Sequence, residues 1–171
     1  MKITLLVVGK TTDARLDALI TEYRNRLSHY IPFDFRVIPD LKNAKSLTQD
    51  QQKQAEGELI LREVGTTSHV VLLDEHGREY RSIEFAAYLQ KIMNNSGPLP
   101  LMGKGCPEGG KGALYFIVGG PYGFSPSVYA RANGKISLSQ MTFSHQMIRL
   151  LFVEQIYRAM TILRGEPYHH E

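Results

Sequence analysis

The chain ends in Tyr168, His169 and His170, three titratable side chains that stand together after a long apolar segment. An imidazole changes its protonation near neutral pH, so such a tail could take part in proton transfer beside a bound ligand. Two adjacent histidines also resemble half of a metal site. No cysteine or acidic cluster completes that site, so we predict no metal. A frayed terminus is the plain alternative.

Two turns of small residues come before this tail, and each is joined to a short apolar segment. Gly119–Gly123 reads GGPYG and follows the strand candidate Leu114–Val118, while Leu138–Phe143 reads LSQMTF and ends the next candidate. Glycine allows the backbone to approach a ligand closely. If the two loops meet, backbone groups and apolar walls would form one pocket for a flat ligand.

A third loop candidate, DEHGR, follows the apolar segment Val70–Leu73. Ligands of open α/β sheets bind beyond the carboxyl ends of the strands, so Leu73 and Asp74 are expected to line a cleft. A role for Asp74 in shaping the turn is equally compatible with the sequence. Glu75 and Arg78 are interpreted as solvated turn residues.

Short apolar segments alternate with helical patterns along the whole chain, which predicts βαβ units, a mostly parallel sheet flanked by helices and a single α/β domain over residues 1–171. The predicted strands are Ile3–Val8, Phe33–Ile38, Val70–Leu73, Leu114–Val118 and Lys135–Leu138. The predicted helices are Thr12–His29, Thr48–Val64, Ser82–Asn95, Ser125–Ala132 and Ser144–Leu163, with Ser82 as a helix cap.

Residues 95–112 are dense in glycine and proline and predict an inserted loop. Gly105–Gly112 has the spacing of a phosphate-binding loop until its last position, where glycine replaces the Ser or Thr that binds magnesium. Cys106, the only cysteine, could be a nucleophile, but without a nearby base an incidental thiol is favoured. A nucleotide-dependent enzyme that uses this loop is kept as an alternative.

The last helix candidate is apolar on almost every side, so we expect it to be buried in the core and also in a subunit interface. Arg149 and the pair Glu154–Arg158 are interpreted as the few polar side chains that remain on this otherwise apolar helix. His145, near the start of the helix, is interpreted as a packing or hydrogen-bonding residue.

Composition agrees with a cytoplasmic protein. The single cysteine allows no internal disulfide, and no apolar run is long enough to cross a bilayer. The formal net charge of +3 is compatible with a phosphate-rich partner without demonstrating one.

Taken in order, these segments resemble the small single-domain RlmH family of SPOUT methyltransferases, which methylate pseudouridine in large-subunit ribosomal RNA. The resemblance spans the chain and rests on MKITLLVVGK, VVLLDEHG, FIVGGPYGF, SLSQMTFSHQMIRLLFVEQIYRA and RGEPYHHE. It implies a SPOUT-type fold with a C-terminal trefoil knot, a homodimer, and S-adenosylmethionine bound in the knotted loops. The family usually has a short link where this chain has residues 95–112.

The resemblance also implies roles for individual residues. The positions that match the family's cofactor contacts are Leu73, Gly119, Leu138, Ser139, Gln140, Met141, Thr142 and Phe143. In similar proteins the tail of one subunit helps to complete the site of the other, so Tyr168, His169 and Arg164 become candidates for RNA contact or proton removal. His169 is the favoured base. The implied reaction is methylation of N3 of a pseudouridine, on the assembled ribosome. A non-catalytic ribosome-associated RNA-binding protein is the alternative.

Overall fold

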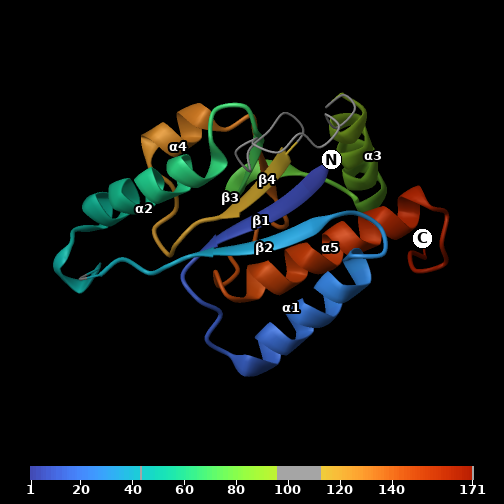
Figure 1. Cartoon of the computed structure of the whole chain (residues 1–171), viewed down its shortest axis with the longest axis horizontal. Helices are drawn as coiled ribbons and strands as arrows, with labels where there is room; N and C mark the ends of the chain where they lie inside the picture. Colours follow the sequence, from blue (N-terminus) through green and yellow to red (C-terminus); the bar gives the residue numbers. More distant parts are fainter. Residues whose placement is uncertain (43, 96–112, 171) are drawn as a thin grey trace, which may run out of the picture.

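The computed structural model describes residues 1–42, 44–95 and 113–170, which form one five-stranded parallel sheet in the order β2-β1-β4-β3-β5 (Figure 1). The strands are β1 (Lys2–Val8), β2 (Phe33–Ile38), β3 (His69–Glu79), β4 (Ala113–Val118) and β5 (Gly134–Ser137). The helices are α1 (Ala14–Leu27), the short η1 (Ala44–Ser46), α2 (Gln49–Val64), α3 (Ser82–Asn95), α4 (Pro126–Arg131) and α5 (Met147–Leu163). The predicted α/β class with a parallel sheet flanked by helices is confirmed.

Helices cover both faces of the sheet, with α2 and α4 on one face and α1, α3 and α5 on the other (Figure 1). The central strand β4 is buried on both faces, which explains its continuous apolar sequence. Phe116 packs against Phe152 of α5 with ring centroids 4.8 Å apart. Ile117, the next residue, belongs to the cluster under α2 and α4. The core is therefore two apolar layers on either side of one sheet.

The main difference from the sequence prediction is the third strand, which continues to Glu79. The register between β3 and β5 shifts between Leu73 and Arg78, so the DEHGR segment lies inside a bulged strand and not after it. Gly77 allows the two strands to approach closely at the bulge because it has no Cβ. A Cβ there would stand 2.4 Å from the carbonyl carbon of Ile136. A strand of charged residues and glycine has no apolar pattern to reveal it.

Helix boundaries differ from prediction by a few residues. Thr48 caps α2 through a capping box, in which its Oγ1 accepts from Gln51 N and its own N–H donates to Gln51 Oε1. Ser82 was wrongly predicted as a cap, since α3 already begins there and Arg81 O accepts the hydrogen bond of Phe85 N. The last helix begins at Met147.

The predicted insertion starts one residue too early, because Asn95 is still helical and ends α3. The rest of that segment lies outside the described residues, and so do Cys106 and the Gly105–Gly112 loop.

Candidate active site

A cavity of about 610 Å³ opens at the carboxyl ends of β4 and β5, beside the bulged part of β3. Its walls come from this bulged part of β3, the Gly-Gly-Pro turn after β4, and the loop that joins β5 to α5. Seven of the eight predicted cofactor-contacting residues line it: Leu73, Gly119, Leu138, Ser139, Met141, Thr142 and Phe143. Gln140 does not line it and is exposed. The two loops that we expected to meet do form one pocket.

The turn after β4 forms one wall, and its glycines allow close packing. Gly119 is buried, and a Cβ there would stand 3.1 Å from the ring of Phe124. A Cβ on Gly120 would come 2.5 Å from a carboxylate oxygen of Glu56, which is buried on α2. Gly123 closes the turn with a φ of 79° and donates from its N–H to Gly120 O at 3.2 Å.

The loop after β5 is shaped by its own hydroxyl groups. Ser137 Oγ donates to Ser139 O at 2.7 Å, and Ser139 Oγ accepts from Met141 N at 2.9 Å. Thr142 Oγ1 donates to Glu75 Oε2 at 3.3 Å and so ties this loop to the bulged part of β3. Met141 is 73% exposed although it lines the cavity. The loop therefore holds an apolar side chain at the open side of the pocket.

Asp74 and Tyr129 form a polar part of the wall. Asp74 Oδ2 accepts from the phenol of Tyr129 at 2.5 Å, and Asp74 Oδ1 accepts from His76 N at 2.9 Å. Burial, with the neighbouring Asp74 next in importance, raises the pKa of Tyr129 well above its usual value. Tyr129 is thus a stable hydrogen-bond donor that orients the carboxylate.

Arg149 is fully buried, so its interpretation as a polar surface residue of α5 is wrong. Its Nη2 donates to Val8 O at 2.7 Å, and its Nη1 donates to Gly9 O at 3.0 Å and to Thr11 Oγ1 at 3.1 Å. Burial lowers the pKa of Arg149. The side chain joins the start of α5 to the end of β1, beside the strand that carries the Gly-Gly-Pro turn.

His145 lines the cavity close to this arginine. Burial, and then the charge of Arg149, lowers the pKa of His145 and favours the neutral imidazole. Sequence reasoning treated His145 only as a packing or hydrogen-bonding residue, and no pattern in the sequence indicated that it would face the pocket.

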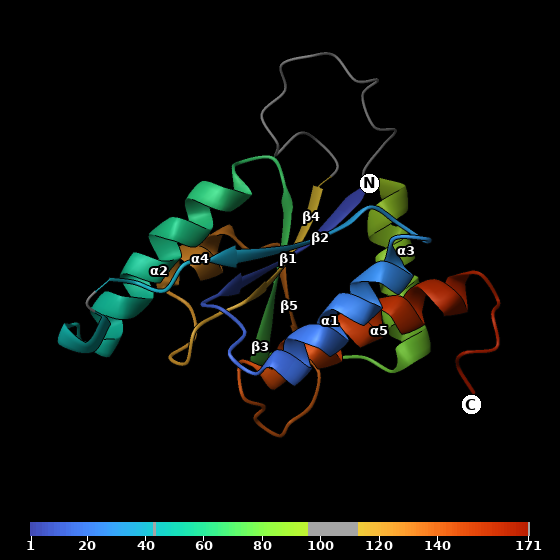
Figure 2. The same ribbon diagram turned by 60° about the horizontal axis from the view of Figure 1, so that its bottom comes forward.

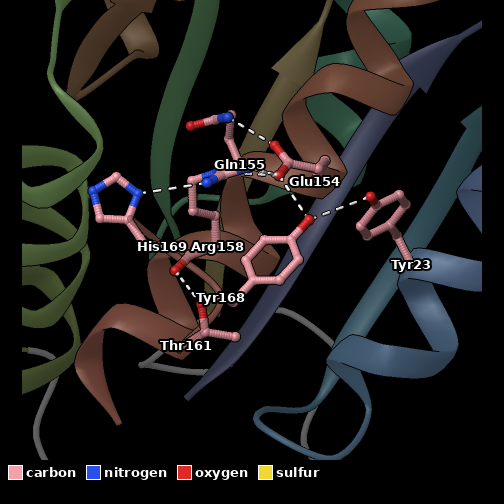
Figure 3. A network of polar contacts seen from close by, with 7 residues as sticks. All are labelled: Tyr23, Glu154, Gln155, Arg158, Thr161, Tyr168 and His169. Carbon is pink, nitrogen blue, oxygen red and sulfur yellow. Dashed lines mark hydrogen bonds and ion pairs between the residues drawn. The ribbon is translucent and has the colours of Figure 1, made fainter. Parts of the chain in front are cut away.

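The tail is held against α5 by a polar network (Figure 3). The phenol of Tyr168 donates to Glu154 Oε1 at 3.0 Å and lies 3.4 Å from the hydroxyl of Tyr23. Glu154 Oε1 also accepts from Arg158 Nη2 at 2.7 Å, and Arg158 Nη1 lies 3.4 Å from His169 Nδ1. Burial, followed by these hydrogen bonds, raises the pKa of Tyr168. The tail through His169 is therefore ordered by specific contacts and is not frayed.

Arg164 lies next to this network without joining it. Its guanidinium stacks over Tyr30 at 4.2 Å from the ring centroid and donates to His29 O at 3.0 Å. The phenol of Tyr30 donates to Glu166, which fixes the chain just before the tail. These contacts attach the end of the chain to the end of α1.

The tail and the cavity lie at opposite ends of α5. Ile148, in the first turn, lines the cavity, whereas the tail packs near Arg158 in the last turns. The helix has 17 residues and so spans about 25 Å. Figure 2 shows the C-terminus far from the loop between β5 and α5. Within one chain, the structure does not bring Tyr168, His169 or Arg164 to the pocket that holds the other predicted residues.

The whole arrangement can be compared with known proteins. A family model described as "Predicted SPOUT methyltransferase" matches residues 1–169. The chain belongs to this family. Proteins of Parabacteroides distasonis and Bacteroides thetaiotaomicron are each 56% identical over 171 residues, with all of this chain and all of the relative covered. One of Flavobacterium johnsoniae is 50% identical with the same coverage. All three are named ribosomal RNA large subunit methyltransferase H.

In residues 1–42, 44–95 and 113–170 of this SPOUT protein, no group of three or more His, Cys, Asp or Glu side chains could hold a metal ion. Among the helices of the same residues, none is long and apolar enough to cross a membrane.

Proposed function

We propose that this SPOUT protein is a methyltransferase that uses S-adenosylmethionine to methylate N3 of a pseudouridine in large-subunit ribosomal RNA. The observation that supports the proposal most is that seven of the eight predicted cofactor-contacting residues line the same cavity, in a chain that belongs to a methyltransferase family. Relatives that are 56% identical over the full length carry the name of a large-subunit ribosomal RNA methyltransferase.

The cavity fits such a methyl donor in size and chemistry. Its volume of about 610 Å³ is in the usual range for small-molecule sites. Leu73, Leu138 and Phe143 supply apolar walls for an adenine ring, and the turn at Gly119 brings backbone groups to the pocket. When bound, S-adenosylmethionine supplies a methyl group already activated on a sulfonium. The chain then has to align the acceptor with it and exclude water.

N3 of the base carries a proton that must leave as the N–C bond forms, so the site needs a proton acceptor or a group that stabilises the charge. Within the tail, His169 is our candidate for meeting this need, either as the proton acceptor or as a hydrogen-bond donor that stabilises the charge, and Tyr168 and Arg164 are candidates for holding the RNA. The phenol of Tyr168 donates its proton to Glu154, so its oxygen can meet the RNA only as a hydrogen-bond acceptor.

We further propose that the enzyme is a homodimer in which the tail of one subunit serves the cavity of the other. The tail is separated from its own cavity by the length of α5, so a second copy is the simplest way to bring them together. The half-buried apolar side chains of α5, such as Leu150 and Leu151, suit a subunit interface. The trefoil knot of the SPOUT fold stays a prediction, because strand order and register do not test it.

A mixed-dimer experiment tests this arrangement. One partner carries Gly119→Phe, which fills the cavity, and the other carries Tyr168→Ala and His169→Ala. Each homodimer should be inactive, but a heterodimer contains one cavity and one tail that are both intact. After mixing, unfolding and refolding, activity should return to about a quarter of the unmixed wild type, because half of the dimers are mixed and each has one working site. No recovery would contradict a tail that acts on its partner.

Cofactor titration separates the proposal from its two rivals. Tight binding of S-adenosylmethionine supports the methyltransferase, and binding of ATP alone would favour a nucleotide-dependent enzyme. Binding of neither would favour a non-catalytic ribosome-associated protein. The assembled ribosome as substrate fits the mild basic excess of the chain, and it places the enzyme in the cytoplasm.

A further inference from the structure

The cavity contains one carboxylate that is both shielded and held in a fixed orientation. The side chain of Asp74 is 8% exposed, whereas that of the neighbouring Glu75 is 58% exposed. Tyr129 and the backbone N–H of His76 each donate to a different oxygen of Asp74. A carboxylate oxygen can accept two hydrogen bonds. Oδ1 also has Nδ1 of His76 at 3.5 Å, whereas Oδ2 meets the Tyr129 phenol and keeps an acceptor position for a ligand.

The charge of the wall is negative. Among the described residues that line the cavity, Asp74 and Glu75 are acidic, His76 and His145 carry imidazoles, and none is Lys or Arg. Lys135 lies 5.5 Å from the ring centroid of Tyr129 but does not line the cavity. A ligand that fills the pocket displaces water from Asp74, and a desolvated carboxylate is costly unless a donor or a cation replaces that water. The pocket is thus complementary to a cationic ligand.

We propose that Asp74, oriented by Tyr129, binds the cationic part of the methyl donor. The inference rests on the proposed function. S-Adenosylmethionine carries a sulfonium and an ammonium against one carboxylate, so its net charge is +1, and either cation can pair with Asp74. Hydrogen bonds donated by the ribose hydroxyls to Asp74 are the competing arrangement, and this arrangement predicts a different ligand dependence.

Calorimetric titration of the full chain and of Asp74→Asn with three ligands tests the proposal. Asn has the same shape as Asp. Its amide oxygen can still accept from His76 N and its amide nitrogen can donate to the phenol oxygen of Tyr129, so the substitution removes mainly the charge. We expect S-adenosylmethionine affinity to fall about tenfold. The affinity of 5′-methylthioadenosine, which has the adenosine but neither cation, should change by less than about twofold. S-Adenosylhomocysteine has the ammonium but not the sulfonium. If Asp74→Asn binds it about tenfold more weakly than wild type does, Asp74 pairs with the ammonium. If its affinity does not change, Asp74 pairs with the sulfonium.

Two further variants complete the test. Glu75→Gln removes an exposed charge of the same wall and should weaken S-adenosylmethionine binding less than Asp74→Asn does. Tyr129→Phe keeps the charge of Asp74 but removes the hydrogen bond that orients it. This variant should therefore also weaken binding of S-adenosylmethionine more than binding of 5′-methylthioadenosine. It replaces Asp74→Asn in the test if that variant does not fold.

The results separate this inference from the function on which it rests. An equal loss for 5′-methylthioadenosine, or no loss for S-adenosylmethionine, overturns the role of Asp74 while the methyltransferase proposal stands. A wild-type chain that binds none of the three ligands overturns both.

Discussion

Arg158 Nη1 lies 3.4 Å from His169 Nδ1, and the direction of this contact decides where the imidazole carries its proton. A guanidinium has donors and no acceptor, so Nδ1 of His169 accepts and the neutral ring holds its proton on Nε2. The nitrogen left for other partners is therefore a donor. This arrangement favours a hydrogen bond from His169 to RNA or substrate over direct removal of the N3 proton.

Two substitutions of His169 should separate these roles. Gln can accept from Arg158 through its amide oxygen and donate through its amide nitrogen, so His169→Gln should keep most of the turnover at saturating ribosomes. His169→Ala should lose at least about tenfold. If His169 is the base, Gln should be as inactive as Ala, because an amide does not take up the proton. Full turnover of His169→Ala would remove the residue from the reaction.

Arg149 should be important for stability because it is buried and satisfies two backbone carbonyls at the end of β1. Arg149→Met should lower the free energy of unfolding by about 3 kcal/mol, measured by urea denaturation. Arg158→Met on the same helix removes a partly exposed ion pair and should cost about 1 kcal/mol or less. Equal losses for the two variants would contradict the structural role of Arg149.

Glu56 should make stability depend on pH. Burial raises its pKa above the usual 4.5, the hydrogen bond from Gln52 opposes this, and the charge of Asp40 adds to the rise. Between the unfolded and folded pKa values the folded protein binds more protons, so stability falls as pH rises through this window. Glu56→Gln should therefore gain stability relative to wild type from pH 4.5 upward.

Urea denaturation at several pH values measures the effect of Glu56. Glu58→Gln, an exposed position on the same helix, is the control and should leave the pH profile unchanged. A wild-type advantage over Glu56→Gln that grows with pH would mean that the Glu56 carboxylate is stabilised by the fold.

Gly119 should be required for donor binding, because a Cβ there would stand 3.1 Å from the ring of Phe124 at the cavity wall. Gly119→Ala should weaken S-adenosylmethionine binding about tenfold. Gly134→Ala, at the start of β5, is a matched control, because the added carbon would meet only the Tyr88 hydroxyl at an ordinary 3.6 Å. Comparable losses at both positions would argue against a specific role for the turn.

Apolar segments made most of the fold predictable. β4 is apolar along its whole length because helices cover both of its faces, and such a strand can be read directly from a sequence. The extension of β3 through Gly77 could not be read, since only its pairing with β5 makes those charged residues a strand. Local propensity does not contain that information.

The candidate site was predictable where it is built from loops at strand ends, as at Gly119 and Leu138. It was not predictable where a side chain reaches a distant element. Arg149 looks like a polar surface residue in the sequence, and only the packing of α5 against β1 shows that its guanidinium replaces water at Val8 and Gly9. The contact between Asp74 and Tyr129 joins residues 55 positions apart and has no local signal.

The most direct test of the account is transfer of tritiated methyl groups from S-adenosylmethionine to ribosomes and to naked ribosomal RNA from a strain that lacks this modification. We predict that label enters large-subunit RNA, that it is recovered as N3-methylated pseudouridine, and that Gly119→Phe abolishes it. Absence of label from ribosomes and naked RNA alike, with a folded chain that binds S-adenosylmethionine, would contradict the proposed reaction.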